Sequence, residues 1–287
     1  MWKELVLPLL ALGFCLLPST KAANIVFVSD HYDELADGVQ DDIGFVELLE
    51  ANGHTVDNTM GAAAGDGYWR TLDADKIAAL NAADLVIYSR NSNSGDYDDD
   101  DEINQWNSIT APLILMSPYL SRSSRWLWVG NTSLTGDGGT PNIEAVDPSH
   151  PLFYEMELDA DNQVEIYDQT VGTGTVSFYN SIDVGNGTLI ATVAGEDRTV
   201  IAEWPAGVEY HAGAGQTPAG RRMLLCVGTR EGVGYGRGEY NLNAQGEKLF
   251  LNAVLYMLGQ LERLKATTPS PKDGTPVSYT HLTLPTN

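Results

Sequence analysis

The chain has 287 residues, and 43% of them are apolar, aromatic residues included, while 19% are charged. This is enough apolar material for a packed core, so wholesale disorder is excluded. The 39 acidic residues far outnumber the 16 lysines and arginines and give a formal net charge of -23. A chain this acidic repels polyanions, which excludes nucleic acid and anionic membrane surfaces as partners.

Residues 1–22 have the pattern of a secretory signal peptide. Lys3 precedes an apolar run over residues 5–17, and small residues surround Ala22, after which we expect cleavage. The apolar run is shorter than the roughly 20 residues that a membrane span needs. The alternative is an uncleaved anchor, but the pattern favours a mature protein without a membrane segment, secreted to the periplasm or the extracellular space.

Loss of the signal peptide would remove Cys15 and leave Cys226 as the one cysteine, so no intramolecular disulfide is expected. Cys226 lies in an apolar run, where a lone thiol is typically a small buried hydrophobe rather than a nucleophile.

The C-terminal end of the chain does not have the pattern of a folded segment. Residues 264–276 are rich in Pro, Thr and Ser and are typical of a linker, which predicts a further module downstream. Residues 277–287 resemble the in-frame translation of a sequencing-library adapter, and we expect them to be an artefact. The folded domain is therefore expected to span residues 23–263.

Short apolar runs alternate with segments of helical periodicity in the first half of this domain. The predicted strands are 24–29, 54–57, 84–89 and 112–117, and the predicted helices are 41–51, 73–82 and 98–109. Parallel strands need crossover connections, so this alternation predicts a parallel sheet with helices on both faces. The first, third and fourth strands should be adjacent, parallel and fully buried.

The second half of the domain is less regular. Residues 130–184 are rich in Gly, Asp, Asn and Thr and are interpreted as a long irregular insertion, with short strands around 163–167 and 175–179. Strands are predicted to resume at 188–193, 199–203 and 222–227, and a helix at 243–261 closes the domain.

A resemblance to a known family is carried by the strand at 24–30, the strand at 83–87, the segment 150–153, the late strand pair at 199–203 and 222–227, and the helix at 246–256. They resemble ThuA-like (trehalose-utilisation) and class I glutamine amidotransferase-like domains. The resemblance implies an α/β fold, a flavodoxin-like three-layer sandwich with a mainly parallel sheet and an irregular mid-chain insertion.

Three further segments, 89–97, 105–107 and 112–116, resemble uncharacterised exported domains of environmental bacteria. In those proteins, a linker similar to residues 269–274 precedes LamG or concanavalin-like modules. The resemblance therefore also implies that this domain belongs to a larger extracellular protein.

The chain departs from the amidotransferase pattern at the nucleophile. Those enzymes carry a Cys in a tight strand-to-helix turn, and here the matching strand end reads Leu-Met-Ser-Pro-Tyr, with Ser117 at its centre. Ser117 has no flanking glycine of the kind that such a turn requires, so the sequence argues against a covalent hydrolase.

Ligands of open α/β sheets bind beyond the carboxyl ends of the strands. The predicted strand ends supply Asp30, His31, Arg90, Asn91, Ser117, Tyr119, Thr229, Arg230 and Glu231, with Arg122 and Arg125 just beyond. Guanidinium groups suit carboxylate, phosphate or sugar hydroxyl oxygens, so these arginines are candidate ligand-binding residues. The alternative is that they form ion pairs with neighbouring acidic residues such as Asp30.

Aromatic residues lie close to these arginines in the sequence. Trp126 and Tyr119 are candidates for flat apolar faces on which a sugar ring would lie, although tryptophans more commonly fill cores.

The chain has no strong metal motif. The acidic run at 96–102 invites a calcium site, but it lacks the glycine and glutamate of a helix-loop-helix calcium loop, and helix capping explains it more simply. The histidines have no zinc-binding spacing. We expect no metal and no other cofactor.

These observations favour a non-covalent, carbohydrate-related binding or accessory module with a small polar ligand. One alternative is a sugar-acting hydrolase or isomerase with Asp30 or Glu231 as general base. The other is a scaffold that binds no ligand. The sequence does not decide among the three.

Overall fold

A computed structural model describes residues 21–30, 33, 38–59, 67–97, 99–136, 139–168, 175–228 and 240–261. The predicted signal peptide up to residue 20, the predicted linker and the adapter-like tail lie outside the described residues. So do the candidate site residues His31, Thr229, Arg230 and Glu231.

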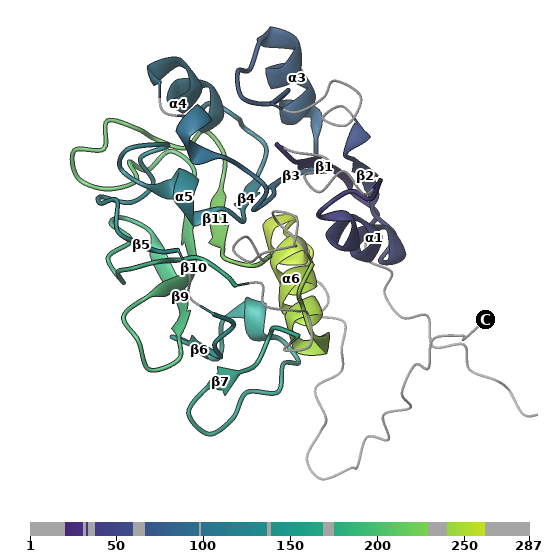
Figure 1. Ribbon diagram of the computed structural model, residues 1–287, viewed down its shortest axis with the longest axis vertical. Helices are drawn as coiled ribbons and strands as arrows, with labels where there is room; N and C mark the ends of the chain where they lie inside the picture. The colour runs from purple at the N-terminus through teal and green to yellow at the C-terminus, as the bar shows by residue number, and fades with distance from the viewer. Residues whose placement is uncertain are drawn as a thin grey trace, which may run out of the picture.

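A mixed β-sheet forms the centre of the structure (Figure 1). Its strands lie in the order β2 (Thr55–Asp57), β1 (Asn24–Val28), β3 (Leu85–Tyr88), β4 (Leu113–Leu115), β11 (Arg222–Leu225), β10 (Thr199–Trp204), β9 (Thr188–Val193), β6 (Ile143–Ala145) and β7 (Gln163–Val164). Beside this row, β5 (Leu134–Thr135) pairs with β8 (Phe178–Tyr179), and β8 pairs with β10. Neighbours from β2 to β11 are parallel, and neighbours from β11 to β7 are antiparallel.

The predicted parallel core is confirmed. β3 lies between β1 and β4 with parallel pairing on both sides, and all residues of β3 and β4 are buried. The expectation of a mainly parallel sheet is wrong for the other half. β9 and β10 are joined by a short turn, and a connection of that length can join only antiparallel neighbours.

The mid-chain segment is also more regular than expected. The predicted strands are found as β7 and β8, but β6 and β7 extend the central sheet instead of standing apart from it. These strands have only two or three residues, which is too short for a period to be visible in the sequence.

Helices lie on both faces of the parallel half (Figure 1). The step from β1 to β2 runs in the opposite direction along the sheet from the steps β2 to β3 and β3 to β4. Because such crossovers are right-handed, α1 (Ile43–Ala51) lies on one face, and α3 (Ala74–Ala82) and α4 (Asp100–Asn107) lie on the other. The last helix, α6 (Ala244–Met257), packs beside α1, with the Phe45 and Phe250 ring centroids 5.3 Å apart.

Side-chain caps define where three of these helices begin. Asp73 accepts a hydrogen bond from a backbone N–H of α3, Asp99 from two of α4, and Asn243 from two of α6. This is the usual way to satisfy the free N–H groups of a first turn. No helix in the described part of the chain is long and apolar enough to cross a membrane.

A cluster of aromatic side chains packs around Trp106 of α4. Trp126 stacks on Trp106 with ring centroids 4.9 Å apart, and Trp128 stacks on Tyr210 at 5.6 Å. The side chain of Asn107 lies among them, where its Oδ1 accepts from Trp128 Nε1 and from the Tyr210 hydroxyl.

Candidate functional site

The ends of β3 and β4 frame an open cavity of about 340 Å³. Its lining comes from the segment after β3 and from α5 (Pro118–Ser121) with the loop that follows it. The lining residues are Arg90, Ser92, Asn93, Ser94, Gly95, Tyr119, Arg122 and Arg125. The structure thus brings together four of the predicted ligand-binding residues, all of them in the part of the sheet that the sequence indicated.

Arg122 and Arg125 both donate hydrogen bonds to Ser94, which lies in the segment after β3. Arg122 Nη2 donates to Ser94 Oγ at 2.8 Å, and Arg125 Nε donates to the Ser94 carbonyl. Arg122 Nε also donates to the carbonyl of Tyr119 at 2.8 Å. Contacts within the protein therefore hold the two guanidinium groups in place.

The loop that carries these two arginines is rigidly held. The amides of Arg125 and Leu127 both donate to the carbonyl of Arg122, at 3.0 and 3.1 Å. Leu127 has a φ of 62°, a left-handed conformation that costs free energy in a leucine. The conformation persists because Trp126 and Trp128, on either side of it, are anchored in the core at 0% and 1% exposure.

The guanidinium groups of Arg90 and Arg122 pack against the ring of Tyr119. The Cζ atoms of Arg90 and Arg122 lie 4.5 and 5.3 Å from the centroid of its ring, within cation–π distance. Its hydroxyl lies so close to Gly136 that a Cβ at that position would come within 2.5 Å of it. A larger residue at 136 would therefore require the Tyr119 ring to shift.

Three basic side chains lie together in the cavity. Its lining, as far as the chain is described, holds three arginines and no carboxylate. Burial and the neighbouring charge of Arg125 both lower the pKa of Arg122, because each disfavours the guanidinium cation. An anion in the cavity would relieve the repulsion between these like charges.

Asp30 does not line this cavity. Its carboxylate is 1% exposed, accepts a hydrogen bond from the Tyr97 hydroxyl at 2.9 Å and pairs with Arg70 at 3.1 Å. A buried carboxylate neutralised in this way is poorly suited to act as a general base. Sequence reasoning missed Arg70, which lies outside the predicted strand ends.

Three other candidates lie behind the cavity. Asn91 and Ser117 are fully buried: Asn91 Nδ2 donates to Ser29 Oγ at 3.0 Å, and Ser117 Oγ accepts from Ser92 Oγ at 3.1 Å. Trp126 is buried against Trp106. None of the three is among the residues that line the cavity.

Sequence reasoning also missed a buried carboxyl group near the end of β3. Asp42 is fully buried just before α1, where Gln40 Nε2 donates to its Oδ1 at 2.7 Å. Burial raises the pKa of Asp42, and hydrogen bonds from Ser89, Gln40 and Ser29 oppose this rise. Its position one residue before a helix was the one available signal.

The described residues include no group of three or more His, Cys, Asp or Glu side chains that could hold a metal ion. In the acidic run, Asp99 caps α4 and Asp96 pairs with Arg70 at 3.1 Å. Burial raises the pKa of the Cys226 thiol to about 12, so this thiol is not a nucleophile at neutral pH.

No protein-family model matches the sequence, and no curated protein is significantly similar to it. The chain is similar to the solved structure of the cytoplasmic protein STM3548 from Salmonella typhimurium, with 10% identity, a TM-score of 0.49 and coverage of 81% of this chain and 98% of that one. It is also similar to a ThuA-like protein from Bacteroides uniformis, with 10% identity, a TM-score of 0.46 and coverage of 82% and 90%. Likenesses at this level carry no argument about function.

Proposed function

We propose that the chain is a non-covalent binding module for a small acidic carbohydrate, held in the cavity between the ends of β3 and β4. The observation that carries this proposal is that three arginines line one cavity, in a chain of net charge -23. The negative net charge of the whole chain disfavours acidic ligands, so basic side chains must be concentrated at a site that binds one. Guanidinium groups bind carboxylates with two parallel hydrogen bonds.

The remaining lining suits the rest of a sugar. Asn93 and Ser92 offer hydrogen-bonding groups for hydroxyls, and Tyr119 offers an aromatic ring. The volume of about 340 Å³ is near the lower end of the range of roughly 300–1,000 Å³ for small-molecule sites. This favours a single sugar ring or the end of a chain over a long polymer segment.

Binding fits the site better than catalysis does. The described lining contains no carboxylate, histidine or thiol that would serve as general base or nucleophile. Asp30 forms an ion pair with Arg70, and Glu231 lies outside the described residues. A hydrolase or isomerase would therefore have to take its base from elsewhere.

The proposal includes the setting predicted from the sequence. We infer an exported domain of ThuA-like, flavodoxin-like arrangement, followed by a linker and a further module. The signal-peptide pattern of residues 1–22 and the composition of residues 264–276 support export and the linker. The helices on both faces of the parallel half support the fold.

Calorimetric titration with D-glucuronate, D-galacturonate and D-glucose tests the function. We expect the uronates to bind at least about tenfold more tightly than glucose, a difference of about 1.4 kcal/mol. Arg122→Met keeps the apolar stem and removes the charge, so it should weaken uronate binding by about tenfold or more. The matched control is Arg198→Met, in the turn between β9 and β10, which should leave binding unchanged.

Two results would overturn the proposal. Equal binding of glucose and the uronates would remove the acidic preference. Absence of binding by uronates, sugar phosphates and neutral sugars, in a protein with an unchanged melting temperature, would leave the scaffold interpretation.

A further inference from the structure

Two of the arginines that line the cavity at the ends of β3 and β4 converge on one residue. Arg122 Nη2 donates to Ser94 Oγ at 2.8 Å, and Arg125 Nε donates to the carbonyl of the same serine. The two guanidinium groups are therefore neighbours, and the charge of Arg125 adds to the effect of burial in lowering the pKa of Arg122. Like charges held this close repel each other, and an anion that contacts both relieves the repulsion.

The contacts that hold these arginines restrict how they can bind an anion. In each of them the Nε–H donates to a main-chain carbonyl, that of Tyr119 for Arg122 and that of Ser94 for Arg125. A carboxylate that pairs side-on with a guanidinium group needs this Nε–H together with one Nη–H, so side-on pairing is blocked in both. Arg122 uses two of its five N–H groups within the protein, and the three that remain are all on its Nη atoms.

The Nη ends of two neighbouring guanidinium groups suit a tetrahedral anion better than a planar one. A carboxylate has two oxygens in one plane and a single charge, which is enough for the end of one guanidinium group. A phosphate monoester has three terminal oxygens that point in different directions, and it carries a charge of about -1.5 to -2 at pH 7. It can therefore accept hydrogen bonds from both arginines at once.

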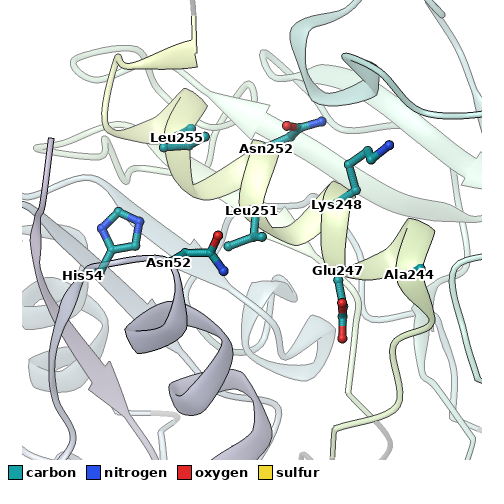
Figure 2. Close-up of a pocket in the computed structure, with 8 residues that line it drawn as sticks. All are labelled: Asn52, His54, Ala244, Glu247, Lys248, Leu251, Asn252 and Leu255. Atoms are coloured by element: carbon teal, nitrogen blue, oxygen red, sulfur yellow. The ribbon is translucent and has the colours of Figure 1, made fainter. Parts of the chain in front are cut away.

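A second cavity of the same volume, about 340 Å³, lacks this arrangement. It lies between α6 and the segment that joins α1 to β2 (Figure 2). The charged residues of its described lining are Glu247 and Lys248, both on α6. The Tyr240 hydroxyl donates to the Glu247 carboxylate, and Lys248 Nζ donates to the carbonyl of Glu155 at 2.7 Å. This cavity has one charge of each sign and brings no two cations together, so it serves as an internal control.

We propose that the acidic group of the ligand is a phosphate monoester, so that the arginine cavity prefers a sugar phosphate to a uronate. The phosphate oxygens bridge the Nη ends of Arg122 and Arg125. Ser94 Oγ accepts from Arg122 and keeps its own hydrogen, which it donates to a further phosphate oxygen. This inference rests on the proposed function, because it takes the acidic-carbohydrate site as given and specifies the acidic group.

Calorimetric titration of the full chain with three derivatives of one sugar ring tests the preference. D-glucose 6-phosphate, D-glucose 6-sulfate and D-glucuronate differ only in the acidic group at carbon 6. We expect glucose 6-phosphate to bind at least about fivefold more tightly than glucuronate, because it contacts both guanidinium groups. Glucose 6-sulfate should lie between the two, because it has the tetrahedral shape but a single charge.

Inorganic phosphate, as a fourth probe, separates a sugar phosphate from free phosphate. It has the same oxygens but no ring to contact Tyr119 and Asn93, so it should bind about tenfold more weakly than glucose 6-phosphate. Equal affinities for the two would overturn the proposal and make the cavity a site for the free anion.

The variant Arg125→Met tests the bridge between the two arginines. It should weaken binding of glucose 6-phosphate by about tenfold and that of glucuronate by no more than about twofold, because a carboxylate needs the end of one guanidinium group only. Lys248→Met removes a cation from the cavity of Figure 2 and should leave both affinities unchanged. If Arg125→Met does not fold, the order of the three ligands in the wild type still decides.

Two results in the wild type separate this inference from the function on which it rests. Glucuronate that binds more tightly than glucose but as tightly as glucose 6-phosphate or glucose 6-sulfate would overturn the phosphate preference and leave the acidic-carbohydrate site standing. Absence of binding by all of these ligands would overturn both.

Discussion

Arg70 and Asp30 form a two-point ion pair across 40 residues of sequence, with Arg70 Nε to Asp30 Oδ1 at 3.1 Å and Nη2 to Oδ2 at 3.2 Å. The Asp30 side chain is fully buried, whereas that of Arg70 is 33% exposed. The pair therefore brings a guanidinium group to the end of β1 to neutralise a carboxylate that is shielded from water. This arrangement makes Asp30 part of the wall behind the cavity rather than a reacting group.

Removal of Arg70 should destabilise the fold. We expect Arg70→Ala to lower the free energy of unfolding by about 3 kcal/mol, because it leaves a buried carboxylate without its countercharge. The control is Arg198→Ala, which breaks the surface ion pair with Glu196 and should cost under about 1 kcal/mol. Urea unfolding of both variants measures the difference, and equal costs would show that the Asp30 pair is no more than a surface contact.

Substitution of Asn107 should lower the free energy of unfolding more than substitution of most other polar residues. Its Nδ2 donates to the Trp126 carbonyl and to Gln216 Oε1, both at 3.0 Å, and its Oδ1 accepts from two aromatic side chains. Asn107→Leu leaves buried polar groups without partners, and we expect a loss of about 3 kcal/mol.

Asn104 provides the control for Asn107 on the same helix. Its Oδ1 accepts from Gln216 Nε2 at 2.9 Å in an exposed position. Asn104→Leu should cost under about 1 kcal/mol in the same urea unfolding experiment. Similar losses of unfolding free energy in the two variants would show that the buried Asn107 side chain has no special role.

The sequence predicted the parts of the fold that follow from local pattern. The buried runs that became β1, β3 and β4 were visible as continuous apolar stretches. The predicted helices 73–82 and 243–261 begin at Asp73 and Asn243, which the structure shows to be helix caps. Strand direction in the second half was not visible, because it depends on which strand each short segment pairs with.

The same distinction holds for the candidate site. Arg90 and Arg122 could be placed at strand ends by counting along the chain, and the structure brings both to the cavity. Whether a side chain points into a cavity or into the core depends on tertiary packing. The sequence therefore could not show that Trp126 stacks on Trp106 or that Asp30 is already paired.

Acid should weaken the fold through Glu203. Burial raises the pKa of this carboxyl, but the nearby His150 ring, hydrogen bonds from Arg221 and Tyr256, and the charge of Arg221 outweigh burial and bring the pKa from 4.5 to about 2. A depressed folded-state pKa stabilises the protein above the unfolded value. This contribution is lost as the pH falls from about 4.5 to about 2.

Glu203→Gln should remove that pH dependence. The difference in unfolding free energy between the wild type and the variant should shrink by about 1–2 kcal/mol between pH 6 and pH 2, after allowance for screening by solvent. Unfolding curves at a series of pH values measure it, with Glu196→Gln as the exposed control. A constant difference across the series would contradict the assigned pKa shift.

The thiol of Cys226 should be inert in the folded protein. It is fully buried, and burial raises its pKa to about 12, so almost no thiolate is present at pH 8. Iodoacetamide should leave the native protein unmodified and should alkylate it fully in urea, as measured by mass spectrometry. Rapid labelling of the native protein would show that the strand end opens to solvent.

Gly136→Ala should disturb the arginine cavity without unfolding the protein. The added Cβ would meet the Tyr119 hydroxyl at 2.5 Å, so the ring must tilt away from the guanidinium groups of Arg90 and Arg122. We expect weaker uronate binding, by about fivefold, and a stability loss of roughly 1 kcal/mol.

Adding Tyr119→Phe removes the clashing oxygen, so the double variant should regain most of both losses. A double-mutant cycle of binding and urea unfolding measures this coupling. Strictly additive effects would show that Gly136 does not position Tyr119, and the cavity would then owe its shape to the Arg122 and Arg125 loop alone.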